Sequence, residues 1–171
     1  AALILIIKKM KLINEIDNFS FEFLGADIPS FLYGEDCIVE GLGEKITSRK
    51  FPKYYFLLVK PNINFSTKAM YDKSNIIFSN LLDENQKNNK LILKEYGNDF
   101  EKIIDKKFGQ IRDILDFIAN SENALFSRMT GSGSCCYGVF NSKIDAINSK
   151  KRFNLQFPNL WSFVCENNII N

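Results

Sequence analysis

The sequence contains no histidine in its 171 residues. Histidine is the side chain whose ordinary pKa best suits proton transfer near neutral pH, and it is the commonest protein ligand for metals. Its absence excludes histidine-based acid–base catalysis and histidine-ligated metal sites. Carboxylates, lysines and hydroxyl groups are left to do any chemistry.

Cysteine is scarce and carries no metal-binding spacing. The chain has 4 cysteines and no Cys-x-x-Cys pair. The adjacent Cys135 and Cys136 would point to opposite faces of a strand, so they are poor joint ligands for one metal ion. We predict reduced thiols in a cytoplasmic protein and no metal site.

Neither a charge excess nor a long apolar run is present. The 22 basic and 20 acidic residues give a net charge of +2, which favours neither nucleic acid nor an anionic membrane as a partner. The apolar start AALILII is too short to cross a membrane, and Lys8 and Lys9 follow it directly. Hydrophobic residues make up 46%, which is ordinary for a globular protein.

In the first part of the chain the pattern predicts helices over 1–13 and 15–23 and short strands over 36–40 and 45–47. Pro29 suits the first turn of a further helix. Pro52 and its charged neighbours mark the expected boundary between two regions, which we place at 1–50 and 51–171.

The second region predicts an α+β fold, with helices on one face of an antiparallel sheet. Its expected elements are a buried strand at 54–59, a short helix at 66–71, an exposed loop at 83–90, one long helix or a helical pair at 99–119, strands at 124–129 and 135–140, a helix at 142–151 and a strand at 161–166.

The tetrapeptide Gly131, Ser132, Gly133 and Ser134 separates two of these strands. Glycine permits positive φ, so such a turn can direct several backbone N–H groups at one anion. Taken alone, a plain hairpin turn is the commoner meaning of this pattern. Nearby Arg128 is either a phosphate clamp or a solvated or ion-paired strand residue.

Three further polar and aromatic residues have simple structural interpretations. Asp27, just before Ile28 and Pro29, is typical of a helix N-cap. Thr67 and Tyr71 lie four positions apart and therefore on one helical face, which fits an N-cap followed by a core aromatic residue.

Three segments change this interpretation when they are read together: GADIP, VKPNINFSTKAMY and SRMTGSGSCCYGVF. In this order they resemble the C-terminal half of a family in the galactokinase/homoserine/mevalonate/phosphomevalonate (GHMP) kinase superfamily. Its members phosphorylate the 2-hydroxyl of 4-diphosphocytidyl-2-C-methyl-D-erythritol in non-mevalonate isoprenoid biosynthesis. The resemblance runs from residue 1 to about residue 164. It implies a GHMP kinase C-terminal domain at 51–171 and a remnant of the N-terminal domain at 1–50.

The resemblance also implies roles for individual residues. Asp27 would be the catalytic base, Tyr71 would stack on the cytosine ring of the substrate and Thr67 would line the same pocket. Gly131, Ser132, Gly133 and Ser134 would support the substrate and the ATP-binding loop. The implied cofactors are ATP and magnesium, and the implied partner is a small-molecule cytidine diphosphate sugar-alcohol.

The glycine-rich ATP loop of the family is expected just before the first residue, and no such loop occurs upstream of Gly25. We therefore expect the 171-residue chain to be inactive by itself. The alternative to a working kinase is a truncated, catalytically inactive remnant. The protein partners this would imply are a separately encoded N-terminal half or, through the apolar start, a second copy of the chain.

Overall fold

The computed structural model describes Met10, residues 25–41, 43–73, Lys94, 96–104 and 108–167. Apart from Met10, the helices predicted at 1–13 and 15–23 and the loop predicted at 83–90 lie outside these residues. The chain forms two compact units that meet in sequence between Pro52 and Lys53. The assignment of the first to a kinase N-terminal domain remains a prediction.

The first unit contains the helix α2 (Ile28–Tyr33) and the strands β1 (Cys37–Glu40) and β2 (Lys45–Ser48). Proline lies in the first turn of α2, as predicted, and Gly34 ends the helix with φ at 74°. The two strands form an antiparallel hairpin. At Gly43 the hairpin turn packs so closely that a Cβ atom would lie 2.1 Å from the carbonyl oxygen of Ala26. This contact fixes the hairpin against the residue before Asp27.

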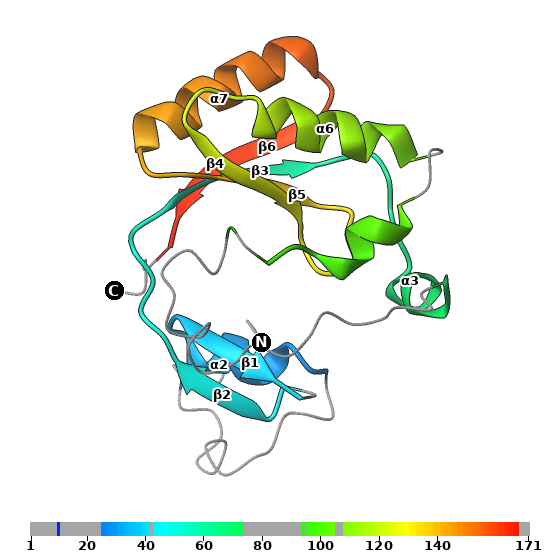
Figure 1. Cartoon of the computed structure of the whole chain (residues 1–171), viewed down its shortest axis with the longest axis vertical. Helices are drawn as coiled ribbons and strands as arrows, with labels where there is room; N and C mark the ends of the chain where they lie inside the picture. Colours follow the sequence, from blue (N-terminus) through cyan, green and yellow to red (C-terminus); the bar gives the residue numbers. More distant parts are fainter. Residues whose placement is uncertain are drawn as a thin grey trace. The chain divides into compact units, whose positions relative to one another are not determined.

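The second unit contains a four-stranded antiparallel sheet in the order β4-β5-β3-β6. Its strands are β3 (Tyr55–Lys60), β4 (Ala124–Met129), β5 (Cys136–Phe140) and β6 (Trp161–Glu166). The helices α6 (Gly109–Ala119) and α7 (Lys143–Gln156) both lie on one face of this sheet (Figure 1). The predicted α+β class, with helices on one face of an antiparallel sheet, is confirmed.

The core of this unit lies between the helices and the sheet. Ile111, Ile114 and Ile118 recur along one face of α6 and are fully buried. Opposite them, Leu57 of β3 pairs with Gly138 of β5. A Cβ atom on Gly138 would lie 2.1 Å from Cγ2 of Ile118, so only glycine lets α6 pack this closely on the sheet.

Of the two alternatives predicted for 99–119, one long helix and a helical pair, the structure has the pair: a 3₁₀-helix, η3 (Asp99–Ile103), and the separate helix α6. Helix α7 continues five residues past the predicted end because Phe153 is buried in the core, and it ends before Pro158.

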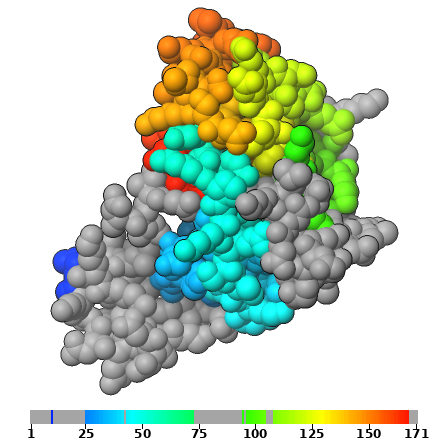
Figure 2. Space-filling model, turned by 60° about the vertical axis from the view of Figure 1, so that its left-hand side comes forward, coloured from blue at the N-terminus to red at the C-terminus, as the bar shows by residue number. Residues whose placement is uncertain are grey.

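In the space-filling view the surfaces of α6 and α7 adjoin (Figure 2). None of the helices in the described residues is both long and apolar enough to span a membrane.

Candidate functional site

The Ser-Gly turn, defined as Gly131–Ser134, connects β4 to β5 and has a fixed internal geometry. The N–H of Thr130 donates to the carbonyl of Cys135, and the N–H of Gly133 donates to the carbonyl of Thr130, both at 2.8 Å. Gly131 and Gly133 have φ values of 45° and 89°, which strain other residues. The turn therefore needs glycine at both positions, as the sequence indicated.

The predicted Thr67 lies directly against this turn. It begins helix α3 (Thr67–Lys73), and its Oγ1 lies 3.0 Å from Oγ of Ser132, at hydrogen-bond distance. The residue that caps α3 is Ser66, whose hydroxyl accepts a hydrogen bond from the N–H of Ala69 at 3.4 Å. The Thr67 side chain is thus turned toward the Ser-Gly turn.

Tyr71 follows one helical turn after Thr67 and is not a core residue. It is 52% exposed, and its ring meets that of Phe100 edge to face, with 5.0 Å between the centroids. An exposed tyrosine held in one orientation by a neighbouring ring is suited to stacking on a flat ligand.

Lys60 is a central residue that our sequence reasoning did not select. Its ammonium group donates to Oγ of Ser134 at 2.7 Å, to the carbonyl of Ile63 at 3.0 Å and to Oδ1 of Asn64 at 3.1 Å. The Ser134 hydroxyl, in a side chain only 3% exposed, donates in turn to the same Ile63 carbonyl. These bonds employ all three donors of the lysine, so Lys60 fixes the turn to the segment after β3. Its position after a buried strand and before Pro61 was the available signal.

Asn98 and Glu101 hold the other end of the turn, and neither residue was predicted from the sequence. Nδ2 of Asn98 donates to the carbonyls of Met129 and Gly131 at 2.8 and 2.7 Å. Oδ1 of Asn98 accepts from the N–H of Phe100 and so caps η3. The carboxylate of Glu101 accepts from the N–H of Met129 at 2.5 Å. An asparagine at a helix start was the visible signal, but its second partner lies about thirty residues away in sequence.

Arg128 does not act as a free phosphate clamp. Its guanidinium group donates to the backbone carbonyls of Lys94, Tyr96 and Ser127, and it lies 5.3 Å from the centre of the Phe126 ring. Both alternatives considered from the sequence, a clamp and a solvated or ion-paired residue, miss this role. The arginine ties the segment before Asn98 to β4.

Asp27 lies in the other unit, at the N-cap position of α2. Its side chain is exposed and makes no capping hydrogen bond, while its backbone carbonyl accepts from the hydroxyl of Ser30 at 2.9 Å. The structure therefore brings Thr67, Tyr71 and the Ser-Gly turn together in one unit. The catalytic role of Asp27 remains a prediction.

Open space lies beside the turn. A cavity of about 510 Å³ is lined by residues of the Asn98 segment, of the end of β4 and the start of the turn, and of β5, namely Gly97, Asn98, Asp99, Phe100, Met129, Thr130, Gly131 and Tyr137. A Cβ atom on Gly131 would meet no atom within 4 Å. The backbone of Gly131 is thus accessible to a ligand. In the described part of the chain, no three His, Cys, Asp or Glu side chains come together to hold a metal ion.

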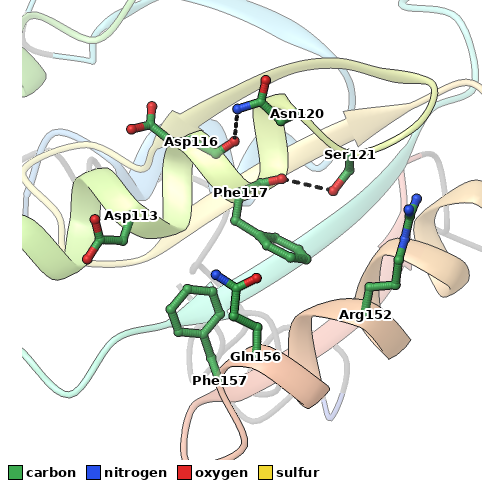
Figure 3. A pocket seen from close by; sticks show the side chains of 8 residues that line it. All are labelled: Asp113, Asp116, Phe117, Asn120, Ser121, Arg152, Gln156 and Phe157. Atoms are coloured by element: carbon green, nitrogen blue, oxygen red, sulfur yellow. Dashed lines mark hydrogen bonds between the residues drawn. The ribbon is translucent and has the colours of Figure 1, made fainter.

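A second hollow lies between α6 and α7 and contains none of the predicted site residues (Figure 3). Two of its polar side chains are engaged in ending α6. Nδ2 of Asn120 donates to the carbonyl of Asp116 at 2.8 Å, and the hydroxyl of Ser121 donates to the carbonyl of Phe117 at 3.0 Å. These bonds satisfy carbonyls in the last turn of the helix, so both side chains have a structural role there.

Comparison with known proteins identifies the family of the chain. A family model described as GHMP kinases C terminal matches residues 67–159, which include Thr67, Tyr71 and the Ser-Gly turn. A 4-diphosphocytidyl-2-C-methyl-D-erythritol kinase from Mannheimia succiniciproducens is 30% identical over 155 residues, covering 90% of this chain and 48% of that protein. The kinase of the same name from Haemophilus ducreyi is 32% identical over 143 residues, covering 84% of this chain and 48% of that protein.

A crystal structure of a 4-(cytidine 5'-diphospho)-2C-methyl-D-erythritol kinase shares the fold. The two structures have a TM-score of 0.59 at 17% identity, and the match covers 84% of this chain and 53% of that one. The chain spans about half the length of the relatives it matches.

Proposed function

Because the chain belongs to the GHMP kinase family, we propose that it supplies the C-terminal half of a 4-diphosphocytidyl-2-C-methyl-D-erythritol kinase. The observation that carries the proposal is the placement of Thr67 and Tyr71 on one helix beside the Ser-Gly turn. An exposed aromatic ring and a turn rich in hydroxyl and N–H groups suit the two ends of a cytidine diphosphate.

The base and the diphosphate of the ligand would be bound by different groups. Tyr71 would stack on the cytosine ring, and the hydroxyls of Thr67 and Ser132 would lie along the same pocket. In the Ser-Gly turn, the N–H groups of the exposed Gly131 and the half-buried Ser132 have no protein acceptor among the described residues, whereas that of Gly133 is already engaged and Ser134 is buried. The free N–H groups are therefore the ones that would face phosphate oxygens.

In the proposed reaction Asp27 accepts the proton of the substrate 2-hydroxyl as its oxygen forms a bond to the transferred phosphorus. The bond from that phosphorus to the ADP oxygen breaks. ATP would supply the phosphoryl group, and magnesium, when bound, would offset part of the negative charge of the phosphates. The described residues fit the substrate end of this reaction, since the turn offers N–H groups and hydroxyls to phosphate. We further propose a cytoplasmic location.

Binding of cytidine diphosphate to the 171-residue chain tests the substrate pocket. We expect calorimetry to detect binding, and Tyr71→Ala to weaken it on the order of tenfold because a stacked base contributes about 1–3 kcal/mol. Phe163→Ala is the matched control, since Phe163 is 51% exposed and lies on β6. Absence of binding, or equal binding of adenosine diphosphate at the same site, would contradict the proposed pocket.

Phosphoryl transfer tests the catalytic role. We expect no release of ADP by the 171-residue chain alone, and release when it is co-expressed with the N-terminal half of a relative. Asp27→Asn should lower that activity by about 10²–10⁴-fold, the usual contribution of a positioned base. Full activity of Asp27→Asn would exclude this role. A complex with no turnover would favour the alternative function, an inactive remnant.

A further inference from the structure

The segment Asn98–Glu101 contacts both ends of the proposed ligand site. Asn98 bonds the backbone carbonyls on either side of Thr130, and Glu101 bonds the N–H of Met129. Phe100, between them, places its ring edge to face with Tyr71 at 5.0 Å. One short 3₁₀-helix therefore links the Ser-Gly turn to the exposed tyrosine.

We propose that Asn98, Phe100 and Glu101 are positioning residues that set the separation between the base-binding ring and the phosphate-binding turn. This inference rests on the proposed function, because it assigns the two ends to a base and a phosphate. The side chains of Asn98 and Glu101 act on the backbone before the free N–H groups, and Phe100 acts on the ring of Tyr71. None of the three needs to touch the ligand.

The direction of the hydrogen bonds explains why asparagine suits the first position. Its amide group supplies two N–H donors for the carbonyls of Met129 and Gly131, and its oxygen accepts from the N–H of Phe100 at 2.9 Å. Aspartate would keep the acceptor and lose both donors. The two functions of the side chain can therefore be separated by Asn98→Asp, which leaves the cap of η3 in place.

The opposite end of the turn has its own restraint. Lys60 holds Ser134 at 2.7 Å, so the turn is fixed at its end independently of Asn98. Loss of the Asn98 donors should consequently free the start of the turn without unfolding it. We expect the start of the turn to be displaced in this variant, which should weaken phosphate binding more than binding of the base.

The first measurement needs no ligand. In Asn98→Asp we expect hydrogen exchange of the hydrogen-bonded amides of Thr130 and Gly133 to become about tenfold faster or more, since the carbonyls of Met129 and Gly131 lose their side-chain hydrogen bonds. Phe100→Ala should leave those amides unchanged and speed exchange in 67–73, because it removes the ring against Tyr71. Asn120→Ala is the matched control, as it removes an Asn-to-carbonyl bond of 2.8 Å at the end of α6. Unchanged exchange in 130–133 of Asn98→Asp would overturn the proposal.

The second measurement compares cytidine diphosphate with cytidine as probes. Asn98→Asp should weaken the diphosphate about tenfold and leave cytidine within about twofold, whereas Phe100→Ala should weaken both to a similar degree. Equal weakening of both probes in Asn98→Asp would overturn the positioning role. If exchange responds as expected but the unmodified chain binds neither probe, the proposed function fails and this role fails with it. If the unmodified chain binds both probes and Asn98→Asp binds them equally well, this inference alone fails.

Discussion

At the scale of single residues, the same side chain can be read as structural or as catalytic, and Asp27 is the clearest case. It occupies the N-cap position of α2, yet its carboxylate is exposed and makes no capping hydrogen bond. A residue typical of N-caps is therefore present without the bond that usually explains it. The carboxylate is left available for the proposed role of catalytic base.

This arrangement predicts a small effect of Asp27→Ala on stability. Loss of a working N-cap typically costs about 1 kcal/mol, and here no such bond exists to lose. We expect urea unfolding to show a change below about 0.5 kcal/mol. Ser142→Ala is the comparison, because Ser142 caps α7 through the N–H of Ile144 at 3.2 Å and should cost about 1 kcal/mol. A large loss of stability in Asp27→Ala would assign the residue to structure.

Cys136 shows how burial changes a side chain whose chemistry the site does not use. Burial raises the pKa of its thiol to about 12, and the nearby Glu101 carboxylate acts in the same direction. An unfolded cysteine has a lower pKa. At a pH between the two pKa values, the folded chain therefore keeps the thiol proton, whereas the unfolded chain releases it. The stabilising contribution of the thiol should therefore decline as pH rises from 9 toward 12.

The difference in unfolding free energy between the wild type and Cys136→Ala isolates this effect from the titration of lysines and tyrosines. We expect the difference to be largest below pH 9 and to shrink steadily above it. Cys135 is partly exposed and supplies the control variant, Cys135→Ala. A difference that stays constant to pH 11 would show that the thiol is not desolvated as the fold indicates.

At the scale of elements, the Ser-Gly turn is restrained from three sides. Thr67 contacts its middle, Lys60 its end, and Asn98 its start. A simple hairpin turn needs only its own backbone hydrogen bonds, and these are present as well. The additional side-chain bonds come from segments far away in sequence, so they determine the position of the turn within the unit.

The two glycines of this turn should differ in their tolerance of substitution. A Cβ atom on Gly133 would lie 2.6 Å from Sδ of Met129 and 2.7 Å from Cδ2 of Phe65, whereas one on Gly131 would meet nothing within 4 Å. Both positions have positive φ, which costs about 1–2 kcal/mol for alanine. Gly133→Ala should add about 1–3 kcal/mol of overpacking. Urea unfolding that ranks Gly131→Ala as equally damaging would contradict this packing.

At the scale of the whole molecule, tryptophan fluorescence can follow one of the two units separately. The chain has a single tryptophan, Trp161, and it lies on β6 in the unit that carries Tyr71 and the Ser-Gly turn. Its fluorescence therefore follows the unfolding of this unit alone. Ligand binding to this unit should be visible in that signal.

Cytidine diphosphate at 100 times its dissociation constant should raise the unfolding free energy followed by Trp161 by about 2.7 kcal/mol, because the ligand binds the folded state only. Asp27→Asn should show the same stabilisation if its carboxylate serves transfer and not binding. Tyr71→Ala, whose binding should be about tenfold weaker, should retain only about 1.4 kcal/mol of it at that ligand concentration. Stabilisation of Tyr71→Ala equal to that of the wild type would place the ligand elsewhere.

Much of this organisation was predictable from local patterns in the sequence. The strands at 124–129 and 161–166 were predicted with the bounds observed for β4 and β6, because alternating and apolar segments with clear ends identify strands. The order of the three motifs identified the family, and the glycines of the turn indicated that positive φ values occur there. These features depend on neighbours in the sequence.

Other features depended on residues distant in the chain, and no local pattern encodes them. The amide of Asn98 acts on a turn thirty-three positions later, and Lys60 acts on a serine seventy-four positions later. Arg128 was open to two interpretations until its carbonyl partners were known. The sequence by itself determined the class of fold and the family, and it supplied the residues of the candidate site. Only the tertiary structure decided which side chains hold those residues in place, because a hydrogen bond between distant segments exists only after the sheet and helices have packed.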